Sequence, residues 1–224
     1  SARFLGYLMN RIERICSFLD KCDSFADVAC DHGYFALYML KNGLCEKAVI
    51  SDISAKCLKK AEALLKNYIG KGVVTPVCCD GLTGIDENTG QTLIAGIGGE
   101  EIIKILDDAY VPRRFVLQPM KNAEAVRKYL LQKNCRIKYD GIFSDGKNYY
   151  FLIKGERSDV KENYTPSQLK YGRDSFSDSV FYNYLKEELD KKKSYLSRGM
   201  TEEHRAGIER EINYIEGVMR GEIE

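Results

Sequence analysis

The sequence predicts an α/β protein with a doubly wound parallel sheet that ends in a β-hairpin and is followed by an antiparallel helical hairpin. Three observations indicate this class. Short apolar runs alternate with segments of helical periodicity, which implies parallel strands joined by right-handed crossovers. The last two apolar runs are separated only by a short DGKN connection, and two long helical patterns follow them. We therefore expect residues 1–156 to form one domain and residues 157–224 to form a linker and the helical hairpin.

The first expected element is an amphipathic helix over residues 7–20, in which Leu8, Ile12, Ile15 and Leu19 recur at helical spacing. Five strands are expected after it; four are followed by a helix, and the third by the turn-rich loop DGLTGIDENTG. The strands are expected over Ser24–Cys30, Lys47–Asp52, Val73–Cys79, Thr92–Ile97 and Phe115–Gln118. The helices are expected over Tyr34–Asn42, from Ser54 onward, over Glu101–Ala109 and over Ala123–Asn134.

Boundary residues support these ranges. Gly43 ends the first of these helices, because glycine adopts the left-handed conformation that terminates helices. The Ser54 hydroxyl can cap the next helix. Pro119 stops the fifth strand, since proline has no amide hydrogen for the ladder.

Two further strands, Arg136–Phe143 and Tyr149–Lys154, are expected with no helix between them. They form a β-hairpin that inserts one antiparallel strand into the parallel sheet. This arrangement is that of class I methyltransferases, whereas dinucleotide-binding folds usually lack the hairpin.

The last part of the chain is expected to be a polar linker over residues 155–175, followed by two helices. The helical patterns are Phe181, Leu185, Leu189, Lys192 and Leu196, and then Ile208, Ile212, Ile215 and Met219. Gly199 separates the two helices, and Thr201 begins the second. The pair has too few heptads to be stable alone, so we expect it to dock on the first domain or to form a weak homodimer.

The composition narrows the class of function. With 34 basic and 33 acidic side chains the formal net charge is +1, so a nucleic-acid site must be a local patch. The eight cysteines contain no CxxC pair and only two histidines accompany them, so no metal site is predicted. We expect reduced, largely buried thiols in a cytoplasmic protein. The apolar runs are far shorter than the ~18 residues of a membrane span, so no membrane association is expected.

Acidic residues stand at the carboxyl ends of successive expected strands: Asp31, Asp52 and Asp80. Ligands of open parallel sheets bind beyond these ends. Asp52 lies roughly 20 residues after the first turn, where a carboxylate can accept the protons of both ribose hydroxyls. Each Asp taken alone could equally cap the next helix. Three such carboxylates at the ends of successive strands favour a ligand that has ribose hydroxyls and an exocyclic amine.

The turn after the first strand indicates the type of cofactor. A dinucleotide site uses GxGxxG so that the backbone approaches a pyrophosphate. The turn here, residues 29–33, reads ACDHG, with a single glycine and an added carboxylate. A fixed negative charge repels pyrophosphate and tolerates a cationic sulfonium. We therefore expect S-adenosyl-L-methionine rather than NAD or FAD.

Five segments together resemble one family: DVACDHGYF (27–35), CDGL (79–82), IAGIGG (94–99), LQP (117–119) and DGKNYYFLI (145–153). In this order and spacing they are similar to the bacterial tRNA (adenine-22-N1)-methyltransferases, TrmK. The resemblance covers essentially the whole chain, including the leading helix and the C-terminal helical hairpin. Four departures are visible. In the first motif Ala29, Cys30 and Gly33 stand where the family has Gly, Ser and Ala, and Met120 stands where the family has the Asn of LQPN.

The resemblance implies a class I methyltransferase domain that uses S-adenosylmethionine to methylate N1 of an adenosine in the tRNA D-arm. Asp31 is then the expected catalytic carboxylate. The expected cofactor residues are Asp27, Ala29, Cys30, Gly33, Asp52, Ile53, Asp80, Gly81, Ala95, Gly96, Ile97 and Gly98. The expected tRNA contacts are Arg11, His32, Tyr34, Gln118 and Lys147, together with lysines of the helical hairpin. Three alternative functions remain. The first is a methyltransferase that acts on a small molecule or a protein, the second a noncatalytic cofactor-binding adaptor, and the third a dinucleotide oxidoreductase.

Overall fold

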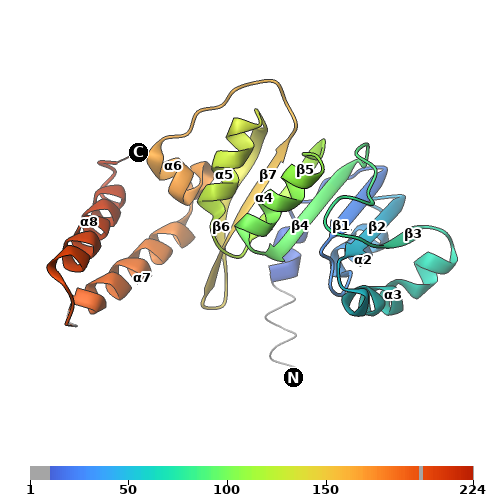
Figure 1. Cartoon of the computed structure of the whole chain (residues 1–224), viewed down its shortest axis with the longest axis horizontal. Helices are drawn as coiled ribbons and strands as arrows, with labels where there is room; N and C mark the ends of the chain where they lie inside the picture. The colour runs from blue at the N-terminus through green and yellow to red at the C-terminus, as the bar shows by residue number, and fades with distance from the viewer. Residues whose placement is uncertain (1–10, 197–198, 224) are drawn as a thin grey trace.

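A seven-stranded sheet forms the centre of the molecule (Figure 1). The computed structural model describes residues 11–196 and 199–223. The strand order is β3-β2-β1-β4-β5-β7-β6. The strands are β1 (Ser24–Val28), β2 (Lys47–Asp52), β3 (Val74–Cys78), β4 (Gln91–Ile97), β5 (Arg114–Pro119), β6 (Arg136–Asp145) and β7 (Asn148–Glu156).

The direction of the strands agrees with the sequence pattern. Strands β1 to β5 pair in parallel, and β7 is antiparallel to both β5 and β6. The predicted insertion of one antiparallel strand by the closing hairpin is therefore confirmed. Because the parallel strands all end at one edge of the sheet, the residues that follow them are brought together there.

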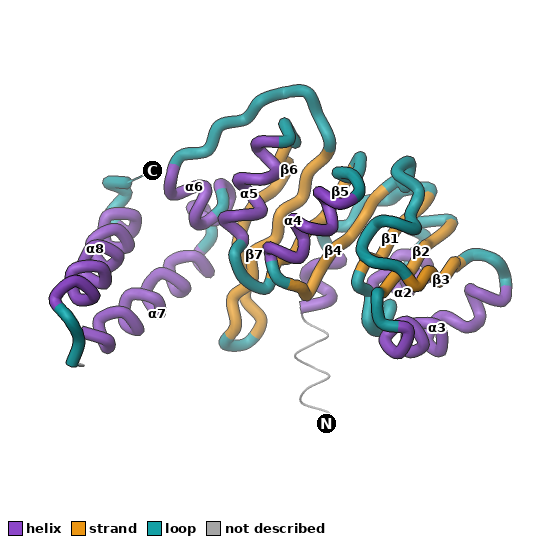
Figure 2. The backbone as a smooth tube through the Cα atoms, viewed as in Figure 1, coloured by secondary structure: helices purple, strands orange, loops and turns teal. Residues whose placement is uncertain are grey.

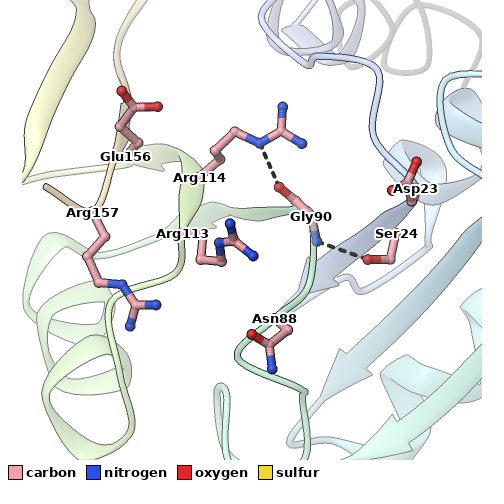
Figure 3. A pocket seen from close by; sticks show the side chains of 8 residues that line it. All are labelled: Asp23, Ser24, Asn88, Gly90, Arg113, Arg114, Glu156 and Arg157. Carbon is pink, nitrogen blue, oxygen red and sulfur yellow. Dashed lines mark hydrogen bonds between the residues drawn. The ribbon is translucent and has the colours of Figure 1, made fainter.

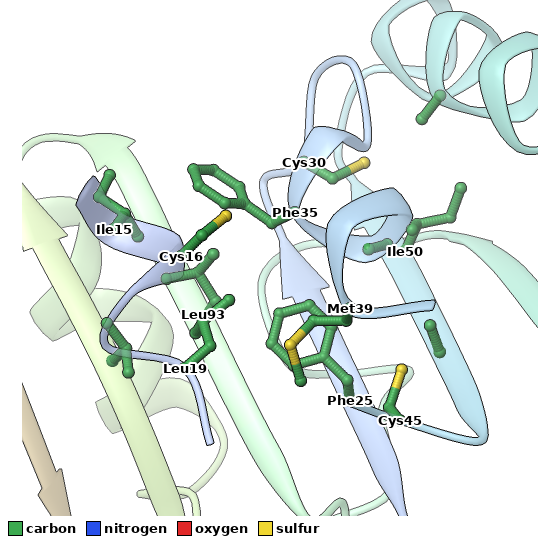
Figure 4. Packing of buried hydrophobic residues seen from close by; sticks show 14 of the residues in the cluster. Ile15, Cys16, Leu19, Phe25, Cys30, Phe35, Met39, Cys45, Ile50 and Leu93 are labelled. Atoms are coloured by element: carbon green, nitrogen blue, oxygen red, sulfur yellow. The ribbon is translucent and has the colours of Figure 1, made fainter. Parts of the chain in front are cut away.

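Helices cover both faces of the sheet. They are α2 (Tyr34–Lys41), α3 (Ala55–Gly70), α4 (Gly99–Asp108) and α5 (Ala123–Gln132). On one face, Met39 of α2 and Leu65 of α3 pack with Ile15 and the strand residues Phe25 and Leu93 (Figure 4). On the other face, α4 and α5 pack on the strands through Ile102, Leu106, Val126 and Leu130. The core is thus two apolar layers with the sheet between them.

The turn-rich loop expected after the third strand is confirmed: the glycine-rich stretch DGLTGIDENTG forms turns at residues 81–84, because it has no helical period. The leading helix ends earlier than expected. In the described part of the leading helix, residues 11–16 are helical and the chain turns at 17–18, short of the expected end at residue 20. Leu8 lies outside the described residues.

The expected linker over residues 155–175 is also wrong. Strand β7 extends to Glu156, and the segment forms helix α6 (Pro166–Tyr171) and a 3-10 turn, η1 (Arg173–Ser177). The Thr165 hydroxyl accepts a hydrogen bond from the backbone amide of Gln168, and the Gln168 side chain accepts one from the amide of Thr165. Tyr171 is buried. Because residues 155–175 are mostly polar, the sequence did not indicate that they contain a capped helix that packs on the sheet.

The predicted helical hairpin is present as α7 (Ser179–Leu196) and α8 (Glu202–Met219), beyond the β6 edge of the sheet (Figure 2). It docks through a third apolar cluster, in which Phe181, Leu185 and Ile215 pack with Ile142 of β6 and Tyr171 of α6. No helix within the described residues is long and apolar enough to cross a membrane.

The hairpin lysines hold the two helices together. Lys191 pairs with Glu188 on α7, while Lys192 pairs with Glu211 and Lys193 with Glu216 across to α8. A lysine that is already paired offers less charge to a phosphate. These side chains therefore contribute first to the contact between the two helices.

Candidate functional site

A pocket of about 250 Å³ opens at the carboxyl ends of the strands, as expected for this class of sheet. It brings together residues from β1, β2, the loop after β3, β4 and helix α4. Of the predicted cofactor residues, six line it: Ala29, Asp52, Ile53, Asp80, Gly81 and Ile97. The remaining lining residues are Val28, Ser51, Cys79, Glu101, Lys104 and Ile105.

Asp52 is fixed in the wall of this pocket. One carboxylate oxygen accepts a hydrogen bond from the backbone amide of Ser54 at 2.8 Å, and the other accepts one from the amide of Asp31 at 3.2 Å. A carboxylate has about four acceptor sites, so both oxygens can still accept from hydroxyl groups. Next to it, the Ile53 side chain is 70% exposed and forms an apolar rim.

The turn between β1 and α2 has the unusual backbone that the sequence indicated. Ala29 has φ 56° and Asp31 has φ 44°, both in the left-handed region that non-glycine residues avoid. Such strain is typical of functional sites that the surrounding fold holds in place. The turn places Ala29 against the pocket and the Asp31 carboxylate, 49% exposed, beside it.

The Asp31 carboxylate is surrounded by donors. It lies 2.7 Å from Lys60 Nζ of α3 and 2.6 Å from His32 Nδ1. Partial burial raises the pKa of Asp31, but hydrogen bonds from Lys60 and Cys57 and the charges of His32 and Lys60 outweigh it, so that the pKa is lowered. The carboxylate is therefore ionised at neutral pH. His32 in turn stacks on Tyr34, with ring centroids 5.3 Å apart.

Replacing Lys60 with Gln is expected to move the acid limb of the pH–activity profile to higher pH. The substitution removes the cation that lowers the pKa of Asp31, so a higher pH is needed to ionise the carboxylate. The rate on the alkaline side should change little. Measuring kcat/KM against pH tests this, with Lys59→Gln on the same helix as the matched control. An acid limb that stays in place would show that Lys60 does not tune Asp31.

Asp27 does not line the pocket. It is 1% exposed beneath the first turn, and its carboxylate accepts a hydrogen bond from the backbone amide of Ala36 in α2 at 3.2 Å. Burial raises the pKa of Asp27 to about 7. In this position the side chain fixes the start of α2 relative to β1.

The raised pKa of Asp27 predicts a pH-dependent stability. The folded-state pKa lies above the unfolded value, so the native state holds an extra proton between about pH 4 and 7. Stability should therefore fall as pH rises through this window, by up to about 1.4 kcal/mol per pH unit. Asp27→Asn should flatten the dependence and exceed the wild type in stability at pH 8. Urea unfolding across this range measures it, with Asp159→Asn as the exposed control; parallel profiles for Asp27→Asn and wild type would contradict the prediction.

The glycine-rich turn after β4 lies beside the pocket. Only Ile97 of the predicted set Ala95, Gly96, Ile97 and Gly98 lines it. Gly96 has φ 84° and produces a register shift between β4 and β5. A Cβ at Gly96 would lie 3.2 Å from the Arg11 guanidinium. Gly98 donates its amide hydrogen to Glu101 at 2.8 Å, which fixes the start of α4.

Arg11, Met120 and Gln118 meet next to this turn. The Arg11 guanidinium lies over the Tyr150 ring at 5.5 Å and donates to Met120 Sδ at 3.7 Å. Gln118 is buried, and its Oε1 has no hydrogen-bond partner among the described residues. Met120 is 47% exposed. The nearby Asn122 side chain donates a hydrogen bond to Glu100 of α4.

Several predicted residues lie outside the pocket wall. Cys30 is buried in the core, and Gly33 packs against Ala61 and Leu65 of α3. Lys147 is exposed in the turn of the β6–β7 hairpin. Since β6 runs parallel to β5, this turn projects from the same edge of the sheet as the pocket. Within residues 11–196 and 199–223, no group of three or more His, Cys, Asp or Glu side chains is arranged to hold a metal.

Seven residues of the site were missed: Lys60 beside Asp31, and the lining residues Val28, Ser51, Cys79, Glu101, Lys104 and Ile105. Glu101, Lys104 and Ile105 line the pocket from α4, and their spacing of three and four places them on one helical face, which the sequence could have indicated. No local sequence pattern indicated Lys60, because its contact with Asp31 joins residues that are 29 positions apart in the chain. Gly81 was found, and the structure explains it: a Cβ there would come within 2.8 Å of Ile105.

The charges of the pocket distinguish between cofactor classes. Among the described residues that line it are three carboxylates, Asp52, Asp80 and Glu101, and a single cation, Lys104. Lys104 lies 3.4 Å from Asp80, which compensates one of the three. The remaining wall is largely apolar. An excess of negative charge disfavours a pyrophosphate and suits a nucleoside that carries hydroxyl, ammonium and sulfonium groups. The residues therefore fit S-adenosylmethionine.

The strand order, the inserted antiparallel strand and the acidic pocket together define a protein of the class I methyltransferase architecture. The chain belongs to the methyltransferase domain family, whose model matches residues 8–153. The methyltransferase domain expected from the sequence is thereby confirmed.

Solved structures show the same fold over nearly the whole chain. TrmK of M. capricolum, solved with S-adenosyl-homocysteine, has a TM-score of 0.83 and 20% identity over 92% of this chain and 95% of its own. The B. subtilis m1A22 tRNA methyltransferase TrmK has a TM-score of 0.79 and 19% identity over 93% and 97%. A Mycoplasma pneumoniae (strain M129) protein, provisionally named a tRNA methyltransferase, is 28% identical over 74% of this chain and 79% of its own length. The resemblance to TrmK inferred from the motifs is confirmed at the level of the fold.

Proposed function

We propose that this chain uses S-adenosylmethionine to methylate N1 of an adenosine at position 22 in the D-arm of tRNA. One observation carries the proposal: Asp52, which accepts a hydrogen bond from the Asp31 backbone amide, lines an apolar-walled pocket whose excess negative charge suits a cationic cofactor. The tRNA substrate is supported by the names of the TrmK structures and the Mycoplasma relative, and by the motifs that this sequence has in common with that family.

The proposed cofactor contacts follow from the pocket wall. S-adenosylmethionine, when bound, supplies an electrophilic methyl group on a positively charged sulfur. Asp52 would accept the protons of the ribose hydroxyls, Ile53 would contact the adenine, and Asp80 would accept from its exocyclic amine. The absence of a side chain at Gly81 makes room for Ile105, which lines the pocket.

Asp31 acts on the target base. Adenine N1 has an in-plane lone pair and needs no deprotonation to attack an activated methyl group, so alignment supplies most of the barrier reduction. The methylated base is cationic. The ionised Asp31 carboxylate stabilises that positive charge or accepts a proton from the exocyclic amine.

Access to N1 requires the base to leave the tRNA stack, which costs roughly a few kcal/mol. Arg11, Tyr34 and Lys147 are the proposed tRNA contacts, with the His32–Tyr34 pair as a stacking surface. Gln118, which was also expected to contact tRNA, is fully buried and does not reach it. A phosphate contact by Arg11 or Lys147 should steepen the salt dependence of tRNA binding.

Asp52→Ala should weaken S-adenosylmethionine binding by about 10- to 100-fold, because it removes charged hydrogen bonds worth about 1.5–3 kcal/mol. Isothermal titration calorimetry measures the affinity. Asp108→Ala, which removes an exposed carboxylate of α4 outside the pocket, is the matched control. An unchanged affinity would exclude Asp52 as the ribose contact.

The function is tested by incubating the protein and labelled S-adenosylmethionine with tRNA from cells that lack the modification, followed by nucleoside mass spectrometry. We expect 1-methyladenosine at position 22. Label in another nucleoside would overturn the assigned position, and label only in protein or small molecules would favour another methyltransferase class. Cofactor binding without turnover of any substrate would indicate a noncatalytic adaptor.

A further inference from the structure

A second pocket, of about 510 Å³, lies at the opposite edge of the sheet, where the parallel strands begin (Figure 3). Its lining residues are Asp23, Ser24, Asn88, Gly90, Arg113, Arg114, Glu156 and Arg157. They come from the starts of β1, β4 and β5 and from the end of the antiparallel strand β7. The methyltransferase site at the other edge uses none of these residues.

Three arginines line this pocket. Arg157 donates its backbone amide to the Arg113 carbonyl at 3.0 Å, so the two side chains leave the chain from adjacent strand ends. Arg114 Nε donates to the carbonyl of Gly90 at 2.8 Å, and the Gly90 amide donates to Ser24 Oγ at 2.9 Å. The backbone beneath the guanidinium groups is thus fixed by hydrogen bonds.

The guanidinium charges are poorly compensated. In the described part of the chain, none of the three arginines forms an ion pair, although two carboxylates line the pocket. Glu156 already binds Lys138 at 2.5 Å. Asp23 is then the single carboxylate left against three cations. The lining therefore carries an excess of positive charge, which a bound anion would compensate.

We propose that this pocket binds a phosphate group. Arginine presents parallel N–H donors that match the oxygens of a phosphate, which is why it predominates where phosphate is recognised in two-point contacts. Arg113 and Arg157 are exposed and unpaired, and so can close on the ligand, while Arg114 is fixed by Gly90. The phosphate belongs either to a free phosphate compound or to an RNA backbone. The inference does not depend on methyl transfer.

Calorimetric titration at low ionic strength tests the site, with inorganic pyrophosphate in one arm and a short single-stranded RNA in the other. The test variant is Arg113→Gln/Arg157→Gln. The control is Lys66→Gln/Lys71→Gln, which removes the same charge from the exposed end of α3. Circular dichroism of both variants, in which only exposed side chains change, verifies that they remain folded.

We expect wild-type protein to bind at least one of the two probes, the arginine variant to bind it at least tenfold more weakly, and the lysine control to stay within twofold of wild type. Weakening in the RNA arm identifies an RNA backbone as the source of the phosphate. Weakening only in the pyrophosphate arm identifies a free phosphate compound. If neither probe binds wild type, or if both variants bind as wild type does, the site does not exist. Because no arm measures methylation, failure here leaves the proposed methyltransferase activity untouched.

Discussion

Asp31→Ala is expected to reduce the kcat of tRNA methylation by about 10²–10⁴-fold, the usual contribution of a positioned acid–base group. The carboxylate that stabilises the cationic base is lost, while the cofactor pocket is kept, because the Asp31 side chain does not line it. Affinity for S-adenosylmethionine should therefore remain close to that of wild type. Single-turnover methylation and calorimetric titration measure the two quantities separately.

Two comparisons make this result specific. Asp31→Asn keeps the size of the side chain and should lose activity to a similar extent, because the charge is what acts on the base. Lys60→Gln removes the partner and leaves the carboxylate, so it should retain most activity at high pH. If Asp31→Ala turns over tRNA at the wild-type rate, Asp31 has no catalytic role.

Arg127→Met is expected to destabilise the fold by about 3–5 kcal/mol, the usual cost of leaving one member of a buried ion pair uncompensated. Arg127 and Asp140 are both fully buried, and Arg127 Nε lies 2.9 and 2.8 Å from the two carboxylate oxygens. Its Nη1 also donates to the carbonyls of Leu169 and Lys170 in α6, each at 3.0 Å. The pair thus joins α5 and β6 to the segment that leads into the helical hairpin.

Urea unfolding followed by circular dichroism measures this loss. The double variant Arg127→Met/Asp140→Leu should recover most of the stability, since apolar residues of similar volume often replace a buried pair without cost. Arg136→Met, at an exposed position of β6, is the control and should be nearly neutral. A small change for Arg127→Met alone, comparable to that control, would contradict the importance of the pair.

Local patterns were enough to predict the elements of the fold. The alternation of apolar strands with amphipathic helices gave the parallel sheet, and the short DGKN connection gave the antiparallel insertion. The strand-end motifs gave six residues of the pocket wall. The same motifs predicted Asp27, Cys30 and Gly33 as cofactor residues, but in the structure these three do not line the pocket. A motif identifies a turn but does not indicate which of its side chains face the ligand.

Helix α6 shows where a local pattern was insufficient. The helix has only six residues, which is too short to show a period of apolar residues. It is held in place by the Arg127–Asp140 pair, since Arg127 donates a hydrogen bond to the carbonyl of Leu169. Gly172, directly after it, packs against both side chains of the pair; a Cβ there would lie 2.6 Å from an Asp140 carboxylate oxygen.

The sequence by itself determined the order of the strands and of the helices other than α6, the family and the acidic first turn, because each of these is a pattern of neighbouring residues. The tertiary structure alone decided that Lys60 holds Asp31, that Arg127 holds Asp140 and α6, and that three arginines line one pocket at the opposite edge of the sheet. Such contacts join residues that are far apart in the chain. Strand register and helix packing set their distances, and no local periodicity encodes them.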